Sequence, residues 1–211
     1  MRGGTACPRR SALTPAVTSV GPVKDDAIAV REFVADDLDA VVAFSLRAWE
    51  PVFTSLHAVL GDEIFFRLHP DWRESQAEAV RSGCTNEERD AFVAVVDTQP
   101  VGFVAVALNA FHDRMGAIEI IGVDPDYQRT GVGATLTKVA LDHMRDHDMD
   151  IAVVETGGDP GHAPARALYT TSGFTVLPIH ATSSPCGNTA LRPTAPALAA
   201  WVRCAGTAAD V

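Results

Sequence analysis

Hydrophobic and polar positions at the start of the patterned region follow two periods, which predict a strand and then a helix. Residues 27–33 alternate with a period of two, as a half-buried strand does. Asp36 or Asp37 then stands where a helix N-cap belongs, and apolar residues recur every three or four positions as far as about Glu50. The expected helix buries the face that contains Leu38, Val41, Val42 and Leu46.

Residues 52–82 continue the helical pattern, but two residues interrupt it. Gly61 and Pro70 are typical helix breakers, so we expect separate helical pieces on either side of them. Large aromatic side chains fall between these breaks, and at such spacing they belong to a core more often than to a binding site. They are Phe53, Phe65, Phe66 and Trp72.

The second half of the patterned region alternates strands and helices. Two apolar runs, residues 91–96 and 101–108, flank an Asp-Thr-Gln-Pro sequence that is typical of a hairpin turn. The pattern after the hairpin predicts, in order, a strand over 117–123, a helix over 131–147, a strand over 151–156, a helix over 163–172 ended by Gly173, and a strand over 174–179. This order predicts a mixed sheet of the α/β (α+β) class and not a doubly wound one.

Composition divides the chain into three zones. Residues 1–24 are rich in Gly, Pro, Ser, Thr and Ala, and we interpret them as a disordered extension. Residues 25–180 carry the periodic patterns and form a single predicted domain. Residues 181–211 return to Ala, Pro, Thr and Ser, and we interpret them as an atypical tail.

The chain shows no sign of membrane insertion, metal binding or nucleic-acid binding. No apolar run approaches the roughly 20 residues that span a membrane, and Pro15 interrupts the start of any signal peptide, so we expect a cytoplasmic protein. The four cysteines lack metal-ligand spacing and are expected to be free thiols in a reducing compartment. Residues 25–180 hold 26 of the 27 acidic and 11 of the 17 basic residues, a net charge near −15 that disfavours nucleic acid and favours a cationic partner such as an amine.

A glycine-containing turn connects the strand over 117–123 to the helix that follows it. Glycines at a helix start let the backbone approach a ligand closely and leave N–H groups pointing outward, and these bind phosphate together with the helix dipole. A P-loop is excluded because Gly133 is followed by Ala134 and Thr135 instead of Lys and Ser or Thr. A dinucleotide fingerprint is excluded because Leu136 stands where a third small residue is needed.

Two motifs together resemble one enzyme family. Gln-x-x-Gly-x-Gly over 128–133, after a strand that ends in Val-Asp-Pro, resembles the pyrophosphate-binding motif of the GNAT N-acetyltransferase superfamily. Residues 165–174 resemble that family's Ala-x-x-Leu-Tyr-x-x-x-Gly-Phe segment. The resemblance covers roughly residues 27–179. It implies a mixed central sheet with splayed strands flanked by helices, acetyl-CoA as co-substrate, and transfer of its acetyl group to a primary amine of a small molecule or protein.

The resemblance also assigns residues to acetyl-CoA. In the family, the pantetheine arm enters the gap between two splayed strands, so the backbone of Ile121 and Val123 is expected to pair with the pantetheine amides. The phosphates are expected at the turn, where Arg129 is a candidate for a charge-assisted contact or for a solvent-exposed surface residue. The expected turn residues are Gln128, Arg129, Thr130, Gly131, Val132, Gly133 and Ala134. Ala165 and His162 complete the expected cofactor contacts; many family members have Asn at the position of His162, where it helps to hold pantetheine.

The chemistry needs an acid for the leaving thiolate and a group that takes the amine's proton. Tyr169 matches the family's tyrosine near the coenzyme sulfur and is the expected general acid. Two carboxylates are candidate bases. Glu119 alternates onto the same strand face as Ile121 and Val123, and Glu155 is the carboxylate at the end of the following strand. Each is also a candidate for an ordinary rim carboxylate.

Four expectations remain open at this stage. The segment around His162 resembles a small bacterial subset often labelled aminoglycoside-acetyltransferase-like. The family usually adds a strand after residue 179, whereas residues 180–188 do not alternate as a strand does. Codons can be chosen for residues 180–188 that, read in another frame, encode Arg-Tyr-Phe-Lys, an ending expected of this subset. We therefore hypothesise that residues 180–211 arise from a frameshift. A catalytically silent acyl-CoA-binding sensor or interaction module is the alternative function, and a homodimer is one of the states that the family adopts.

Overall fold

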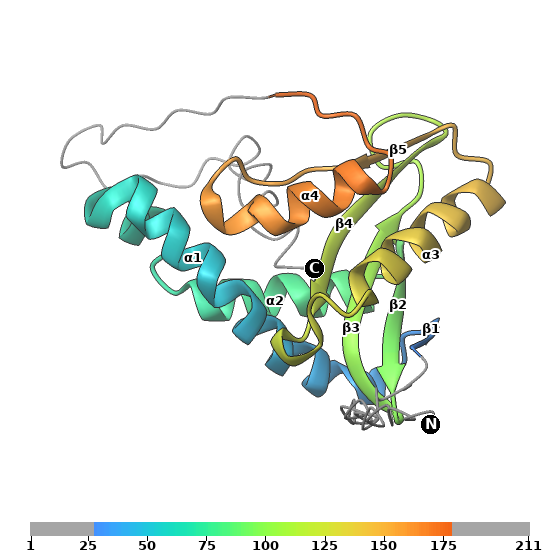
Figure 1. Ribbon diagram of the computed structural model, residues 1–211, viewed down its shortest axis with the longest axis horizontal. Coiled ribbons are helices and arrows are strands. Elements are labelled where there is room, and N and C mark those ends of the chain that lie inside the picture. Colours follow the sequence, from blue (N-terminus) through green and yellow to red (C-terminus); the bar gives the residue numbers. More distant parts are fainter. Residues whose placement is uncertain (1–27, 179–211) are drawn as a thin grey trace, which may run out of the picture.

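The computed structural model describes residues 28–178, which form one sheet with helices on both faces (Figure 1). The predicted extension over 1–24 and the tail over 181–211 lie outside these residues. The strands are β1 (Ala29–Glu32), β2 (Arg89–Val96), β3 (Gln99–Ala107), β4 (Met115–Val123) and β5 (Ile151–Val154). The helices are α1 (Leu38–Leu68), α2 (Trp72–Thr85), α3 (Val132–Asp146) and α4 (Ala163–Thr171), with short 3-10 turns η1 (Ala35–Asp37), η2 (Pro125–Tyr127) and η3 (Pro160–His162).

The strands lie in chain order, β1-β2-β3-β4-β5, which confirms the mixed sheet. The first three pairings are antiparallel and the last, β4 with β5, is parallel. The hairpin between β2 and β3 is confirmed. It turns on Asp97 and Thr98, both with positive φ, between the paired residues Val96 and Gln99.

The helices pack against the two faces of the sheet through two hydrophobic clusters, one on each face. On one face, α1 and α2 pack through residues such as Trp49 and Val80 against Phe103 and Ile120. On the other face, α3 and α4 pack against Val104, Ile118, Ile121 and Val123. The contributions of the two helices to this second cluster are Val132, Leu136, Ala140, Met144, Ala165, Leu168 and Tyr169. The strand faces therefore decide which helix pair each β4 side chain meets.

Helix α1 is longer than the sequence pattern predicts. The prediction that it stops near Glu50 is wrong, because the helix continues through Pro51 to a kink at Gly61, beyond which a second helical segment reaches Leu68. A proline inside a helix costs about 3 kcal/mol, but Trp49 and Val52 beside it are fully buried, and each contributes roughly 1.5–3 kcal/mol. The predicted break at Gly61 is confirmed, since its φ of 70° and ψ of 166° lie outside the helical region.

The last predicted strand is wrong in its described part. Residues 174–178 form no strand, and Val176 and Leu177 are exposed. A strand is stable only where neighbouring strands take up its hydrogen bonds. Within residues 28–178, β5 pairs with β4 alone, and the residues that the family uses for a neighbouring strand lie outside the description. The frameshift hypothesis therefore stays a hypothesis.

Two smaller findings concern the membrane and the cysteines. Among the described residues, no helix is both long and apolar enough to cross a membrane. Cys84 is a buried free thiol. Burial and the nearby carboxylate of Asp37 raise its pKa to about 12, so the thiol is uncharged and unreactive near neutral pH.

Candidate active site

The gap between β4 and β5 is the first element of the site. The two strands pair over four residues, from Met115 with Ile151 to Ile118 with Val154. Beyond this point, Ile121 pairs with Val104 of β3 on its other side, and no described strand pairs with the edge that faces away from β3. The outer edge of β4 at Ile121 and Val123 is therefore without a strand partner within residues 28–178, at the place where the resemblance predicts pantetheine.

The turn after β4 leads into a helix whose first amides are free. Arg129 and Gly131 adopt positive φ values of 60° and 97°, and Gly131 stands at the N-cap of α3 without a side-chain cap. The first helical bond runs from the Thr135 N–H to the Gly131 carbonyl at 3.0 Å, so the earlier amides of α3 point out of the helix. Such an N-terminus attracts anions through its free N–H groups and its dipole.

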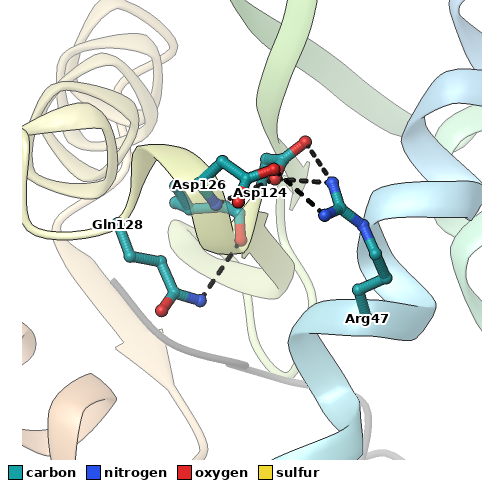
Figure 2. Close-up of polar contacts among 5 residues, drawn as sticks. Arg47, Asp124, Asp126 and Gln128 are labelled. Atoms are coloured by element: carbon teal, nitrogen blue, oxygen red, sulfur yellow. Dashed lines mark hydrogen bonds and ion pairs between the residues drawn. The ribbon is translucent and has the colours of Figure 1, made fainter.

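An ion-pair network fixes this turn against α1 (Figure 2). The Arg47 Nη2 donates to both carboxylate oxygens of Asp124 at 2.7 Å, and its Nη1 donates to Asp126 at 3.1 Å. Asp124 also accepts from the Asp126 N–H and so caps η2. The Gln128 side chain donates to the Val123 carbonyl at 3.4 Å, which occupies one backbone group that the resemblance assigns to pantetheine.

The other turn residues divide between structural and exposed positions. The Thr130 hydroxyl donates to the Tyr127 carbonyl at 2.6 Å and so closes the turn. Val132 and Gly133, the first two residues of α3, are buried, whereas Arg129 and Ala134 are exposed. Arg129 is therefore free to move toward a phosphate, and Ala134 leaves the first turn of α3 open to solvent.

A hollow of about 300 Å³ continues from the turn along the outer side of α3. Its lining includes two cations, and Asp142 pairs with both: with Lys138 at 2.5 Å and with Arg145 at 2.6 Å. The lining residues are Ala134, Lys138, Leu141, Asp142, Arg145 and Ser172.

Tyr169 lies inside the second cluster, beside the β4 edge. It is 4% exposed, and its ring meets Phe174 edge-on at 5.7 Å. Its hydroxyl has no hydrogen-bond partner among the described residues. Burial raises the pKa of Tyr169, so the phenol stays protonated and can donate a proton or a hydrogen bond. Ala165, one helical turn earlier, is fully buried in the same cluster.

Glu119 lies on the face of β4 opposite to the expected one. A β-bulge shifts the register here: Ile120 pairs with Ala105, but Ile118 pairs with Val106. The extra residue breaks the alternation, so the prediction that Glu119 shares the face of Ile121 and Val123 is wrong. It forms an ion pair with Arg89, which also donates to Ser82 of α2. Glu119 therefore points toward α2.

Glu155 directly follows β5 and is partly buried. Its place at the end of the strand agrees with the predicted position at the mouth of the gap. Neither Glu119 nor Glu155 is brought against Tyr169 by a contact described here, so the identity of the base stays a prediction.

His162 is held in an arrangement that the sequence pattern did not indicate. It is 1% exposed, and its Nδ1 bonds the Asp159 carboxylate. Asp159 also accepts from the Gly161 N–H at 2.9 Å, and that amide donates to Ser55 of α1 as well. The spacing of an Asp three residues before a His was the available signal for the pair, but nothing local indicated Ser55.

Comparisons with known proteins agree with this geometry. The sequence model of the Acetyltransferase (GNAT) family matches residues 53–174. A mycothiol acetyltransferase from Saccharomonospora viridis is 29% identical over 164 residues, which cover 72% of this chain and 47% of that protein. The chain thus spans less than half of the length of this relative.

Solved structures show the same fold. The PaiA N-acetyltransferase from Thermoplasma acidophilum, in complex with coenzyme A, superimposes with a TM-score of 0.53 at 17% identity over 72% of this chain and 91% of that chain. An aminoglycoside N-acetyltransferase in complex with coenzyme A gives 0.51 at 13% identity, over 76% and 95%. Because the family match covers more than half of the chain and the fold agrees, the chain belongs to the GNAT acetyltransferase family.

Proposed function

We propose that this chain transfers the acetyl group of acetyl-CoA to a primary amine. The observation that carries the proposal is the buried hydroxyl of Tyr169, which has no partner within residues 28–178 and belongs to the cluster that contains Ile121 and Val123 of β4. A buried hydroxyl without a partner costs free energy, which a purely structural role would avoid by using phenylalanine. A ligand sulfur in the gap would give this hydroxyl its partner.

Acetyl-CoA would extend from the turn into the gap. The outward amides at the start of α3, from Arg129 to Ala134, would bind the pyrophosphate, with Arg129 as the mobile cation. Pantetheine would pair with the backbone of Ile121 and Val123 after the Gln128 side chain leaves the Val123 carbonyl. Ala165 would line the gap, and the contact of His162 with pantetheine stays a prediction from the resemblance.

The reaction would be direct attack of a neutral amine on the thioester carbonyl. Tyr169 would protonate the departing thiolate, which suits a phenol kept protonated by burial. Glu119 and Glu155 remain candidate bases. Glu119 already forms an ion pair with Arg89.

We propose a small-molecule amine as the first acceptor to test. Mycothiol and aminoglycosides occur in the names of the matched proteins, and the predominance of acidic residues in the domain favours a cationic amine. A protein amine, a homodimer and a cytoplasmic location remain predictions from the sequence.

A coenzyme A release assay across a panel of amines tests the proposal. Release that depends on one amine supports the enzyme, whereas tight acetyl-CoA binding without release on any amine supports the silent sensor. Ala134→Glu should weaken acetyl-CoA binding, because it adds a carboxylate beside the expected phosphates at an exposed position. Ala134→Gln is the matched uncharged control and should bind as the natural chain does.

A further inference from the structure

A buried histidine–carboxylate pair occupies the junction of α1 and α4. Asp159 and His162 belong to the loop and the short η3 turn that connect β5 to α4. In Figure 1 this orange segment lies beside α1. A Cβ on Gly161 would approach the Ser55 Cβ and the Val52 Cα to 2.9 Å, so the turn packs directly on the helix backbone. The pair is thus built into the fold between two helices.

The carboxylate sets the tautomer of the imidazole. An ionised carboxylate can only accept, so Asp159 accepts the Nδ1 proton of His162, and Nε2 is the ring nitrogen left to take up or give the second proton. Burial alone would raise the pKa of Asp159, but hydrogen bonds and charge from His162, Ser55 and the Gly161 amide lower it to about 2. Asp159 therefore stays ionised and holds the ring in one orientation.

The basic nitrogen has no partner in the described part of the chain. His162 is almost completely buried, and its Nε2 makes no hydrogen bond there. It stands at the N-cap of α4 and precedes Tyr169 by seven residues, so the two residues lie about two helical turns apart along this segment. Tyr169 also carries an unpartnered buried polar atom. Two buried polar atoms without a partner within residues 28–178, both in the segment that runs from η3 into α4, point to one ligand site that the two side chains share.

We propose that His162 is a catalytic base of the acetyl transfer, oriented by Asp159 as a positioning residue. The inference rests on the proposed function. The amine nitrogen attacks the thioester carbonyl carbon, forming the N–C bond, and the C–S bond breaks. The amine's proton passes to Nε2 of His162, and the thiolate takes the proton of Tyr169. The products are the amide and free coenzyme A; His162 then releases its proton to water, and Tyr169 regains one.

The surrounding charges suit this role. Asp159 stabilises the imidazolium that forms when Nε2 takes a proton. Arg166 of α4 donates from Nη1 to the carbonyls of Gly157 and Asp159 at 2.6 and 2.8 Å, so backbone oxygens beside the pair hold its guanidinium. From α1 the neighbouring polar group is the uncharged hydroxyl of Ser55. By contrast, the candidate base Glu119 is already paired with a cation.

His162→Asn is the principal test, because it supplies the amide that the family usually has. With the most reactive amine of the panel, we expect kcat to fall by about 10²–10⁴-fold while the acetyl-CoA Kd, measured by calorimetry, changes less than twofold. The acidic limb of the kcat–pH profile should disappear. His143→Asn is the matched control, since His143 of α3 also pairs with a carboxylate, Asp90 of β2, at 2.8 Å; its kcat should be unchanged.

Each other outcome overturns the proposal in a recognisable way. A weaker Kd with unchanged kcat would mean that His162 only holds pantetheine. Absence of turnover by the natural chain with every amine would refute the proposed function first, and this inference with it.

Asp159→Asn should lower kcat and change the pH profile without changing the Kd.

A spectroscopic measurement covers the case in which the buried variants fail to fold. Long-range ¹H–¹⁵N spectra of the natural chain should show His162 as the Nδ1–H tautomer. An Nε2–H tautomer would refute the base role without any activity measurement, because the lone pair would then lie on Nδ1, which faces the Asp159 carboxylate.

Discussion

Tyr169→Phe should make the protein more stable and less active at once. The hydroxyl of Tyr169 is buried and has no described partner, and such a group costs about 1–3 kcal/mol. Phenylalanine keeps the ring and its edge-on contact with Phe174 but removes that cost. We therefore expect the free energy of unfolding without ligand to rise by about 1–3 kcal/mol, and the melting temperature to rise by a few degrees. Loss of the general acid should reduce kcat by about 10²–10⁴-fold.

Urea unfolding at constant m, with and without acetyl-CoA, measures the first effect. Acetyl-CoA should stabilise the natural chain more than the variant, because only the natural chain gains a partner for the hydroxyl. Tyr127→Phe is the control: Tyr127 is partly exposed, so its stability should change by less than about 0.5 kcal/mol. A Tyr169→Phe protein that is less stable than the natural chain, or equally active, would refute the reasoning.

Three further changes test the supports of the site. Arg47→Met breaks an exposed ion pair worth roughly 0.2–1 kcal/mol, so the melting temperature should hardly change. The acetyl-CoA Kd should nevertheless rise about two- to tenfold. As a control, Arg114→Met breaks a similar pair at the other end of β4 and should leave the Kd unchanged. Because the pKa of Asp159 is lowered to about 2, its ionised form stabilises the fold above about pH 4. Roughly 2 kcal/mol of the free energy of unfolding should be lost as pH falls from 4 to 2. Urea unfolding midpoints of Asp159→Asn should not show that loss. Gly161→Ala should cost about 1–3 kcal/mol through overlap with the backbone of α1, whereas Gly158→Ala, with nothing within 4 Å of its Cβ, should cost much less in the same urea assay.

Local patterns predicted most elements of this fold and failed where distant contacts decide. The hairpin at Asp97 and Thr98 and the break at Gly61 are properties of short segments, and both predictions are confirmed. Helix α1 passes through Pro51 because burial of its neighbours against the sheet outweighs the local cost, which no periodicity shows. Residues 174–178 have the composition of a strand but no described neighbour to pair with.

The same division applies to the site. The turn from Gln128 to Gly133 was predictable because its residues are consecutive. Glu119 was placed on the wrong face because a single extra residue in β4 reverses the alternation. Arg47 reaches Asp124 from 77 positions away, and the contacts of His162 depend on Ser55 of another helix. Such partners become visible only when the chain is folded.

The short pairing of β4 with β5 has a consequence for the stability of the folded chain over time. Strands β4 and β5 pair over four residues only. Beyond them the outer edge of β4 has no strand partner within residues 28–178, and an unpaired strand edge is a template for unwanted strand addition. Under the proposed function, the co-substrate would fill this edge at each turnover and leave it bare at each release. Because a ligand that binds only the folded state stabilises it more as its concentration rises, the supply of acetyl-CoA would affect the lifetime of the folded chain as well as its rate of turnover.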